Sequence, residues 1–165
     1  MRKALLVMCV LFAVSSFAQD QSKMQLSVFA SNPGYVQSSR VGSHYTGGIG
    51  AALEYRWNRQ WALELQAATQ EHGHYEGRTY PVDLLLHYRF ENDSRWKPFL
   101  GAGFRYENSS FSEFDERSGI EIDGGVHFML TPSLSLRMDA KQLVLDRNGH
   151  FGIDLRPSIG FGWKF

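Results

Sequence analysis

Two histidines separated by a single glycine, His72 and His74, form the spacing in this chain that most resembles a metal site. On an extended segment such residues point to the same side, so both imidazoles could bind one divalent cation. Glutamate and glycine surround them, however, and a histidine pair in a polar loop is usually just solvated. We therefore predict no metal site and no cofactor.

A second candidate is the carboxylate pair Glu121 and Asp123, whose spacing superficially resembles general acid–base machinery. Arginines on the flanking segments are natural partners, so we expect ion pairs here. The glycine-rich stretches 47–50 and 101–103 resemble fragments of phosphate-binding loops, but both lie inside extended segments, away from any strand-to-helix turn. The sequence thus predicts neither a catalytic residue nor a nucleotide site.

The elements that position these residues show apolar and polar side chains in strict alternation, which indicates β-strands with two unlike faces. In the last segment, Ile153, Leu155 and Ile159 alternate with Asp154 and Arg156. The same pattern predicts eight strands, at residues 23–30, 43–57, 60–70, 79–90, 97–107, 119–130, 133–143 and 151–165.

The connections between these strands alternate in length. Residues 58–59, 91–96 and 131–132 are short, whereas 31–42, 71–78, 108–118 and 144–150 are longer and rich in Ser, Asn, Gly, Asp and Glu. Such an alternation places all short turns at one end of the sheet and all longer loops at the other. Proline cannot donate a hydrogen bond to a strand ladder, so we expect a local bulge at Pro157, in mid-strand. Pro81 lies near a strand end, where we expect the sheet to accommodate it.

Residues 1–18 have the basic start, the short apolar core and the small residues of a secretory signal peptide, with cleavage before Gln19. Residues 19–165 then form one domain of an exported protein. Cys9 is the one cysteine and lies in the signal, so the mature chain has no disulfide. Equal numbers of Lys+Arg and Asp+Glu, 17 each, argue against a nucleic-acid partner.

The distribution of aromatic residues indicates which strand face meets lipid. Tryptophan and phenylalanine cluster beside the short turns and tyrosine beside the longer loops, as at the two interfaces of a bilayer. The sequence therefore predicts an all-β, eight-stranded antiparallel up-and-down transmembrane β-barrel with its apolar face outside.

The polar face would then fill the lumen, which in an eight-stranded barrel is only just wide enough for side chains. Charges persist there only when paired, and near-equal numbers of acids and bases are available. The predicted lumen charge network consists of Glu54, Arg56, Glu64, Asp83, Arg89, Arg105, Glu121, Asp123, Arg137, Asp139, Lys141, Asp154 and Arg156.

Residues 97–104 and 131–137, with the aromatic ending of the chain, resemble the small outer-membrane β-barrel family of OmpA-like, OmpX-like and opacity-protein-like surface proteins. The resemblance implies a Gram-negative cell outer membrane, outer-membrane lipid and the outer-membrane assembly machinery as partners, and Trp163 and Phe165 as part of an assembly signal. It also implies a structural or surface-interaction role in envelope integrity or adhesion. A narrow porin-like channel for small or hydrophobic solutes and a lipid A-modifying enzyme remain alternatives.

Lipid A deacylases of this architecture carry a His-x-Ser pair, which none of the six histidines here provides. We therefore predict that the chain is not an enzyme. Phe111 and Phe114, in an acidic loop, could form a recognition patch for an extracellular ligand or fold back onto the barrel rim, and the sequence leaves both possibilities open.

Overall fold

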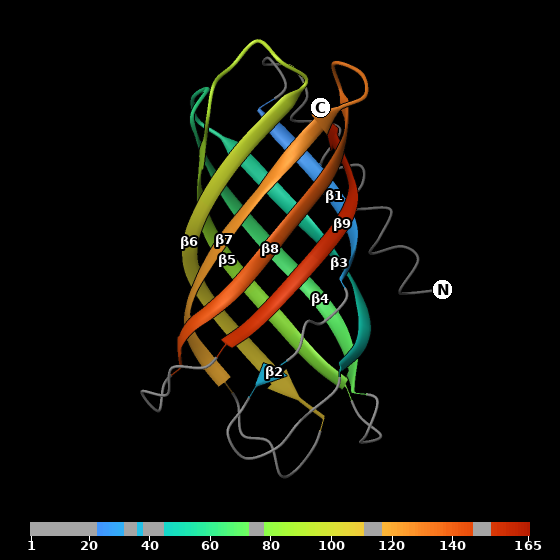
Figure 1. The fold of residues 1–165 in the computed structure, drawn as a ribbon, viewed down its shortest axis with the longest axis vertical. Helices are drawn as coiled ribbons and strands as arrows, with labels where there is room; N and C mark the ends of the chain where they lie inside the picture. Colours follow the sequence, from blue (N-terminus) through green and yellow to red (C-terminus); the bar gives the residue numbers. More distant parts are fainter. Residues whose placement is uncertain (1–22, 32–35, 38–44, 73–77, 111–116, 147–152) are drawn as a thin grey trace, which may run out of the picture.

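The computed structural model describes residues 23–31, 36–37, 45–72, 78–110, 117–146 and 153–165, and these ranges form one antiparallel β-sheet. Eight long strands follow one another in sequence order, and the first pairs with the last to close a barrel (Figure 1). The strands are β1 (Met24–Ser31), β3 (Tyr45–Arg56), β4 (Trp61–His72), β5 (Arg78–Arg89), β6 (Trp96–Ser109), β7 (Arg117–Met129), β8 (Leu134–Asp146) and β9 (Ile153–Lys164).

The predicted eight-stranded antiparallel barrel is confirmed, and every long strand begins and ends within three residues of its predicted position. The sequence did not predict β2 (Val36–Gln37), a two-residue strand that pairs with the beginning of β9. No helix in the described part of the chain is long and apolar enough to cross a membrane.

Side chains alternate between a buried and an exposed environment along each long strand, as β5 shows most regularly. Its even-numbered residues from Tyr80 to Leu86 are exposed and apolar, whereas Asp83 and His87 are fully buried. The exposed face is apolar and the buried face is polar, which reverses the arrangement of a soluble barrel.

The three short connections lie at one end of the barrel, at the top of Figure 1, together with the end of β9. Side-chain oxygens organise each turn. The Asn58 side chain accepts hydrogen bonds from the backbone N–H groups of Gln60 and Trp61 at 2.8 and 2.7 Å, and Thr131 accepts one from Leu134 at 2.9 Å. These side-chain oxygens take the place of the backbone acceptors that the neighbouring strand no longer supplies in the turn. We call this the turn end and the opposite one the loop end.

The bulge expected at Pro157 is wrong, because the register of β8 with β9 continues unchanged through the pair of Ala140 and Pro157. In β9 the Lys164 N–H bonds to β8 and the Phe165 N–H bonds to β1, so odd-numbered residues face β1. The side of Pro157 that lacks an N–H therefore faces β1. The pairing of β1 with β9 ends at the pair of Ser31 and Ser158, one position short of Pro157. Among the described residues, the ladder therefore loses no bond at Pro157 that a bulge would have to restore.

Pro81 lies near a strand end, as expected, and it interrupts the ladder. The N–H of Arg89 bonds to β4, so Pro81 faces β4 as well. Pairing of β4 with β5 runs from Trp61 to Ala67 and resumes at Gln70, skipping the two positions opposite Tyr80 and Pro81. A missing donor explains this gap.

Candidate functional site: the charged lumen

The inner face of the barrel holds the main concentration of reactive side chains in the described residues. Because the small barrel leaves little free width, these groups contact one another across it. Twelve charged side chains inside are at most 7% exposed: Glu54, Glu64, Asp83, Arg89, Arg105, Glu107, Glu121, Asp123, Arg137, Asp139, Lys141 and Arg156.

Arg137 on β8 is the centre of the middle layer. Its guanidinium contacts Glu64 on β4, donates to Asp139 at 2.5 Å and lies 3.4 Å from Asp123. The same group sits over the ring of Phe99, 5.2 Å from the centroid. One cation thus serves three carboxylates from three strands, with an aromatic face beneath it.

At the turn end, Glu54 on β3 is the principal acceptor. Arg89 Nη2 donates to both carboxylate oxygens of Glu54 at 2.6 Å, and Arg56 Nε donates to one of them at 2.9 Å. Arg56 also donates to the side-chain oxygen of Gln25 on β1 at 2.9 Å. Glu54 and its two arginines therefore link three strands, β1, β3 and β5.

Towards the loop end, arginines again bridge strands. Arg105 donates to Glu121 at 2.5 Å and lies 3.1 Å from Asp83. Arg156 contacts Glu107 at 3.1 Å and donates to Gln70. Lys141 on β8 hydrogen-bonds Gln66 on β4, and its ammonium lies 5.3 Å from the ring centre of Phe29.

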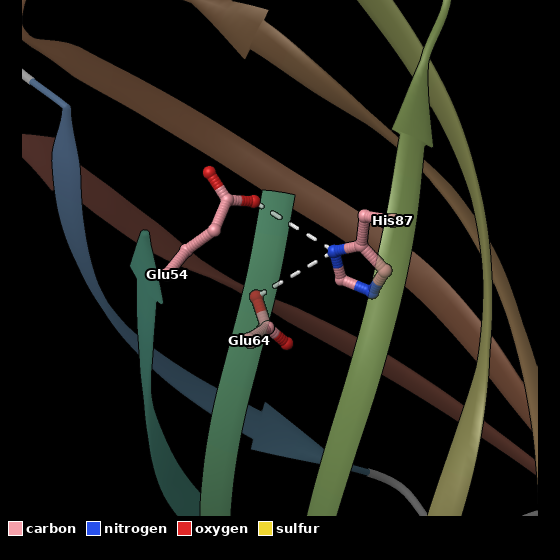
Figure 2. A group of neighbouring side chains, drawn as sticks. All are labelled: Glu54, Glu64 and His87. Carbon is pink, nitrogen blue, oxygen red and sulfur yellow. Dashed lines mark ion pairs between the residues drawn. The ribbon is translucent and has the colours of Figure 1, made fainter. Parts of the chain in front are cut away.

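His87 faces the carboxylates of Glu54 and Glu64 with the same ring nitrogen, Nδ1, as Figure 2 shows. Its Nδ1 is 3.7 Å from Glu54 and 4.0 Å from Glu64, and its Nε2 is 3.1 Å from Asp123. Donor atoms of His87, Glu54 and Glu64 lie within 4.8 Å of one another, a spacing at which one cation could touch all three. Those carboxylates already accept hydrogen bonds from Arg89 and Arg137, so guanidinium groups supply the positive charge of this cluster.

The structure brings together the predicted lumen residues whose side chains it describes. Arg56 is half-buried, and the others are buried and in contact with an opposite charge or an amide. Asp154 belongs to β9 and pairs through its backbone with Leu143, but its side chain lies outside the described residues, as do those of His72 and His74. Trp163, at the turn end of β9, is 65% exposed.

Sequence reasoning missed several residues that complete these contacts. Gln25, Gln66, Gln70 and Glu107 share the strand face of the predicted charges, so the alternation alone could have found them. Phe29 and Phe99 occupy the same inner face although both are apolar. Position on the strand, more than residue type, decides which side a residue faces.

Several exposed aromatic residues form a band at the turn end, whereas Tyr80 and Tyr106 are exposed towards the loop end. Trp61, Tyr88 and Phe90 stack edge to face at 5.1 and 5.2 Å, and Trp96 packs against Phe128 at 4.6 Å. All four tryptophans of the chain, Trp57, Trp61, Trp96 and Trp163, lie at this end and are at least 37% exposed. Amphipathic aromatic rings concentrate where a bilayer meets water.

The sequence profile of the outer membrane protein beta-barrel domain matches residues 4–165. The chain belongs to this family. It is therefore an integral protein of the cell outer membrane, and the exposed apolar strand faces lie in membrane lipid.

Solved structures show the same fold. Neisserial surface protein A superposes with a TM-score of 0.67 at 17% identity, covering 87% of this chain and 98% of that one. The N-terminal barrel of Pseudomonas aeruginosa OprF gives 0.65 at 15% identity, covering 88% and 98%. Yersinia pestis Ail, the attachment invasion locus protein, crystallised with the heparin analogue sucrose octasulfate, gives 0.60 at 12%, covering 86% and 97%. No curated protein sequence matches the chain significantly.

Proposed function

We propose that this barrel is a structural and surface-interaction protein of the outer membrane whose lumen is plugged by its own ion pairs. The observation that carries the proposal is the contact between opposite walls. In the closed order of strands, β4 and β8 are four places apart and therefore face each other across the lumen. Arg137 and Lys141 of β8 nevertheless contact Glu64 and Gln66 of β4.

A plug of this kind supports a barrel that does not conduct. Separating these buried charges would leave several of them unpaired in a narrow space, which costs much more than breaking a surface pair. An open pathway would need that separation along the whole lumen. The middle layer around Arg137 and the layer around Arg105 would both have to give way.

Planar-bilayer recordings test the plug. The purified protein should give no discrete current steps. The double variant Arg137→Ala with Lys141→Ala, which removes both cross-lumen contacts, serves as the control for an opened lumen. Discrete conductance of the unaltered protein would replace the plug with the alternative of a narrow channel.

The membrane position of the chain and the names of two similar proteins support the surface role. One is called a surface protein, and another is an attachment protein bound to a heparin analogue. We propose that the longer loops bind an extracellular ligand, with Phe111 and Phe114 as candidates, although both lie outside the described residues. Cells displaying the unaltered chain should bind immobilised sulfated glycan or matrix protein better than cells displaying Phe111→Ser with Phe114→Ser. Equal binding by both would argue against this loop.

We also infer that the chain is not an enzyme. The two lumen histidines, His87 and His127, lie among buried charges, and neither is followed two residues later by a serine. Unaltered lipid A mass spectra in cells that overproduce the chain would agree with this inference, and a new lipid A species would refute it.

A further inference from the structure

Positive and negative charges are not matched evenly along the lumen, and cations exceed carboxylates at the turn end. Arg56, Arg89, Lys97 and Lys164 reach this end from four different strands, and we call them the turn-end cation cluster. Glu54 is the buried carboxylate among them. Its two oxygens already accept hydrogen bonds from both arginines.

The two lysines of the cluster lack a carboxylate partner among the residues that the structure describes. The ammonium of Lys164 lies 3.8 Å from the sulfur of Met129, and that of Lys97 contacts the backbone carbonyl of Asn92. Both lysines are half-buried. A cation held partly out of water without a counter-charge is unfavourable, so an anion at this position would stabilise the fold.

Neutral polar groups lie buried beside the cluster. The amide nitrogen of Gln25 lies 3.4 Å from His127 Nδ1, and the other ring nitrogen of His127 lies 3.4 Å from Arg89. Glu91, in the turn before β6, is the second carboxylate near Arg56. Counting only side chains, the four cluster cations against Glu54 and Glu91 leave a surplus of two positive charges, 4 − 2.

We propose that the turn-end cation cluster binds a phosphate-type oxyanion at the mouth of the lumen. A doubly charged oxyanion matches the surplus, and guanidinium and ammonium groups are its usual protein partners. The phosphate can come from two sources, a free phosphate in the aqueous compartment or the headgroup of an anionic phospholipid. The adjoining tryptophan band places the cluster close to headgroup depth, so both sources can reach it.

Titration calorimetry of the folded protein in a non-ionic detergent tests the site, with inorganic phosphate as the probe and sodium chloride holding the ionic strength constant. Saturable binding is expected. Lys164→Gln, alone and with Lys97→Gln, should weaken it about tenfold or more, because each substitution removes a charge-assisted hydrogen bond. Arg78→Gln is the matched control, since it removes a cation that is exposed, lies at the loop end and pairs with Glu71.

A second arm identifies the source, with mixed micelles that contain either phosphatidylglycerol or zwitterionic phosphatidylcholine. If phosphatidylglycerol stabilises the folded protein, phosphatidylcholine does not, and the effect disappears in the lysine variants, the site binds a lipid headgroup. Binding of inorganic phosphate without lipid dependence would assign it to a free anion. The proposal is overturned if neither probe binds saturably, or if Arg78→Gln weakens binding as much as Lys164→Gln. Heat-dependent gel migration confirms that each variant is folded.

Discussion

Replacing Arg137 by methionine removes the cation that holds the middle layer of the lumen together. Glu64, Asp123 and Asp139 then lose a shared partner while remaining buried, at no more than 7% exposure. Removing one member of a buried ion pair costs about 3–5 kcal/mol, since the charge left behind has no water to solvate it. Three carboxylates are affected here, so we expect the upper part of that range. The side chain of methionine preserves packing against Phe99.

The assay is urea unfolding of the protein in detergent or lipid, followed by tryptophan fluorescence and by heat-dependent gel migration. Arg78→Met is the control: it breaks the pair with Glu71 at 2.7 Å, in which both side chains are more than half exposed. Exposed pairs contribute about 0–1 kcal/mol, so this variant should unfold close to the unaltered protein. Arg137→Lys should fall between the two, because an ammonium is a point charge and cannot reach three carboxylates at once.

The reasoning is refuted if Arg137→Met lowers the free energy of unfolding by no more than Arg78→Met does. In that case water or protonation would be compensating the three carboxylates, and the lumen contacts would not hold the opposite walls together. A cycle that adds Glu64→Gln separates these explanations, because it reports the coupling of the two residues directly.

Three further predictions concern the wall of the barrel. Gly103→Ala should lower the free energy of unfolding by about 1–3 kcal/mol in the same urea assay, because its Cβ would overlap the carbonyl of Leu84 on β5, whereas a loss below about 0.5 kcal/mol would mean that the strands part without strain. Leu84→Arg, on the exposed face in the middle of β5, should lower the free energy of unfolding in a bilayer by about 2–4 kcal/mol. Leu130→Arg, at the turn end, should lower it by only about 0–1 kcal/mol. Equal losses would contradict the proposed depth of these two positions in the bilayer. Trp163→Ala with Phe165→Ala should reduce the amount of folded barrel in outer-membrane fractions several-fold, while the yield of refolding in detergent stays within about twofold of the unaltered chain. Normal insertion in cells would show that these two residues are not part of the assembly signal.

Alternation along the chain was enough to predict the strands, because a β-strand sends successive side chains to opposite faces and only one of the two environments is apolar. Leu155, Ile159 and Phe161 are exposed and Arg156 is buried, as the pattern requires. The prediction of a bulge at Pro157 was wrong because the cost of a proline in a sheet depends on which neighbouring strand its missing N–H faces. That direction follows from the register of β9 with β8 and β1, which one strand alone does not contain.

The sequence by itself determined the number of strands, through local periodicity and the length of the connections, and the face that meets lipid, through the positions of the aromatic residues. It also predicted most of the charges that turn inward, although it missed Glu107. Only the tertiary structure decided which charges meet. Arg137 and Glu64 are 73 residues apart and belong to opposite walls, so their contact depends on the closure and stagger of the barrel. The same closure brings Lys97 and Lys164 to one mouth without a carboxylate for either among the described residues, a surplus that the balanced charge of the whole chain conceals.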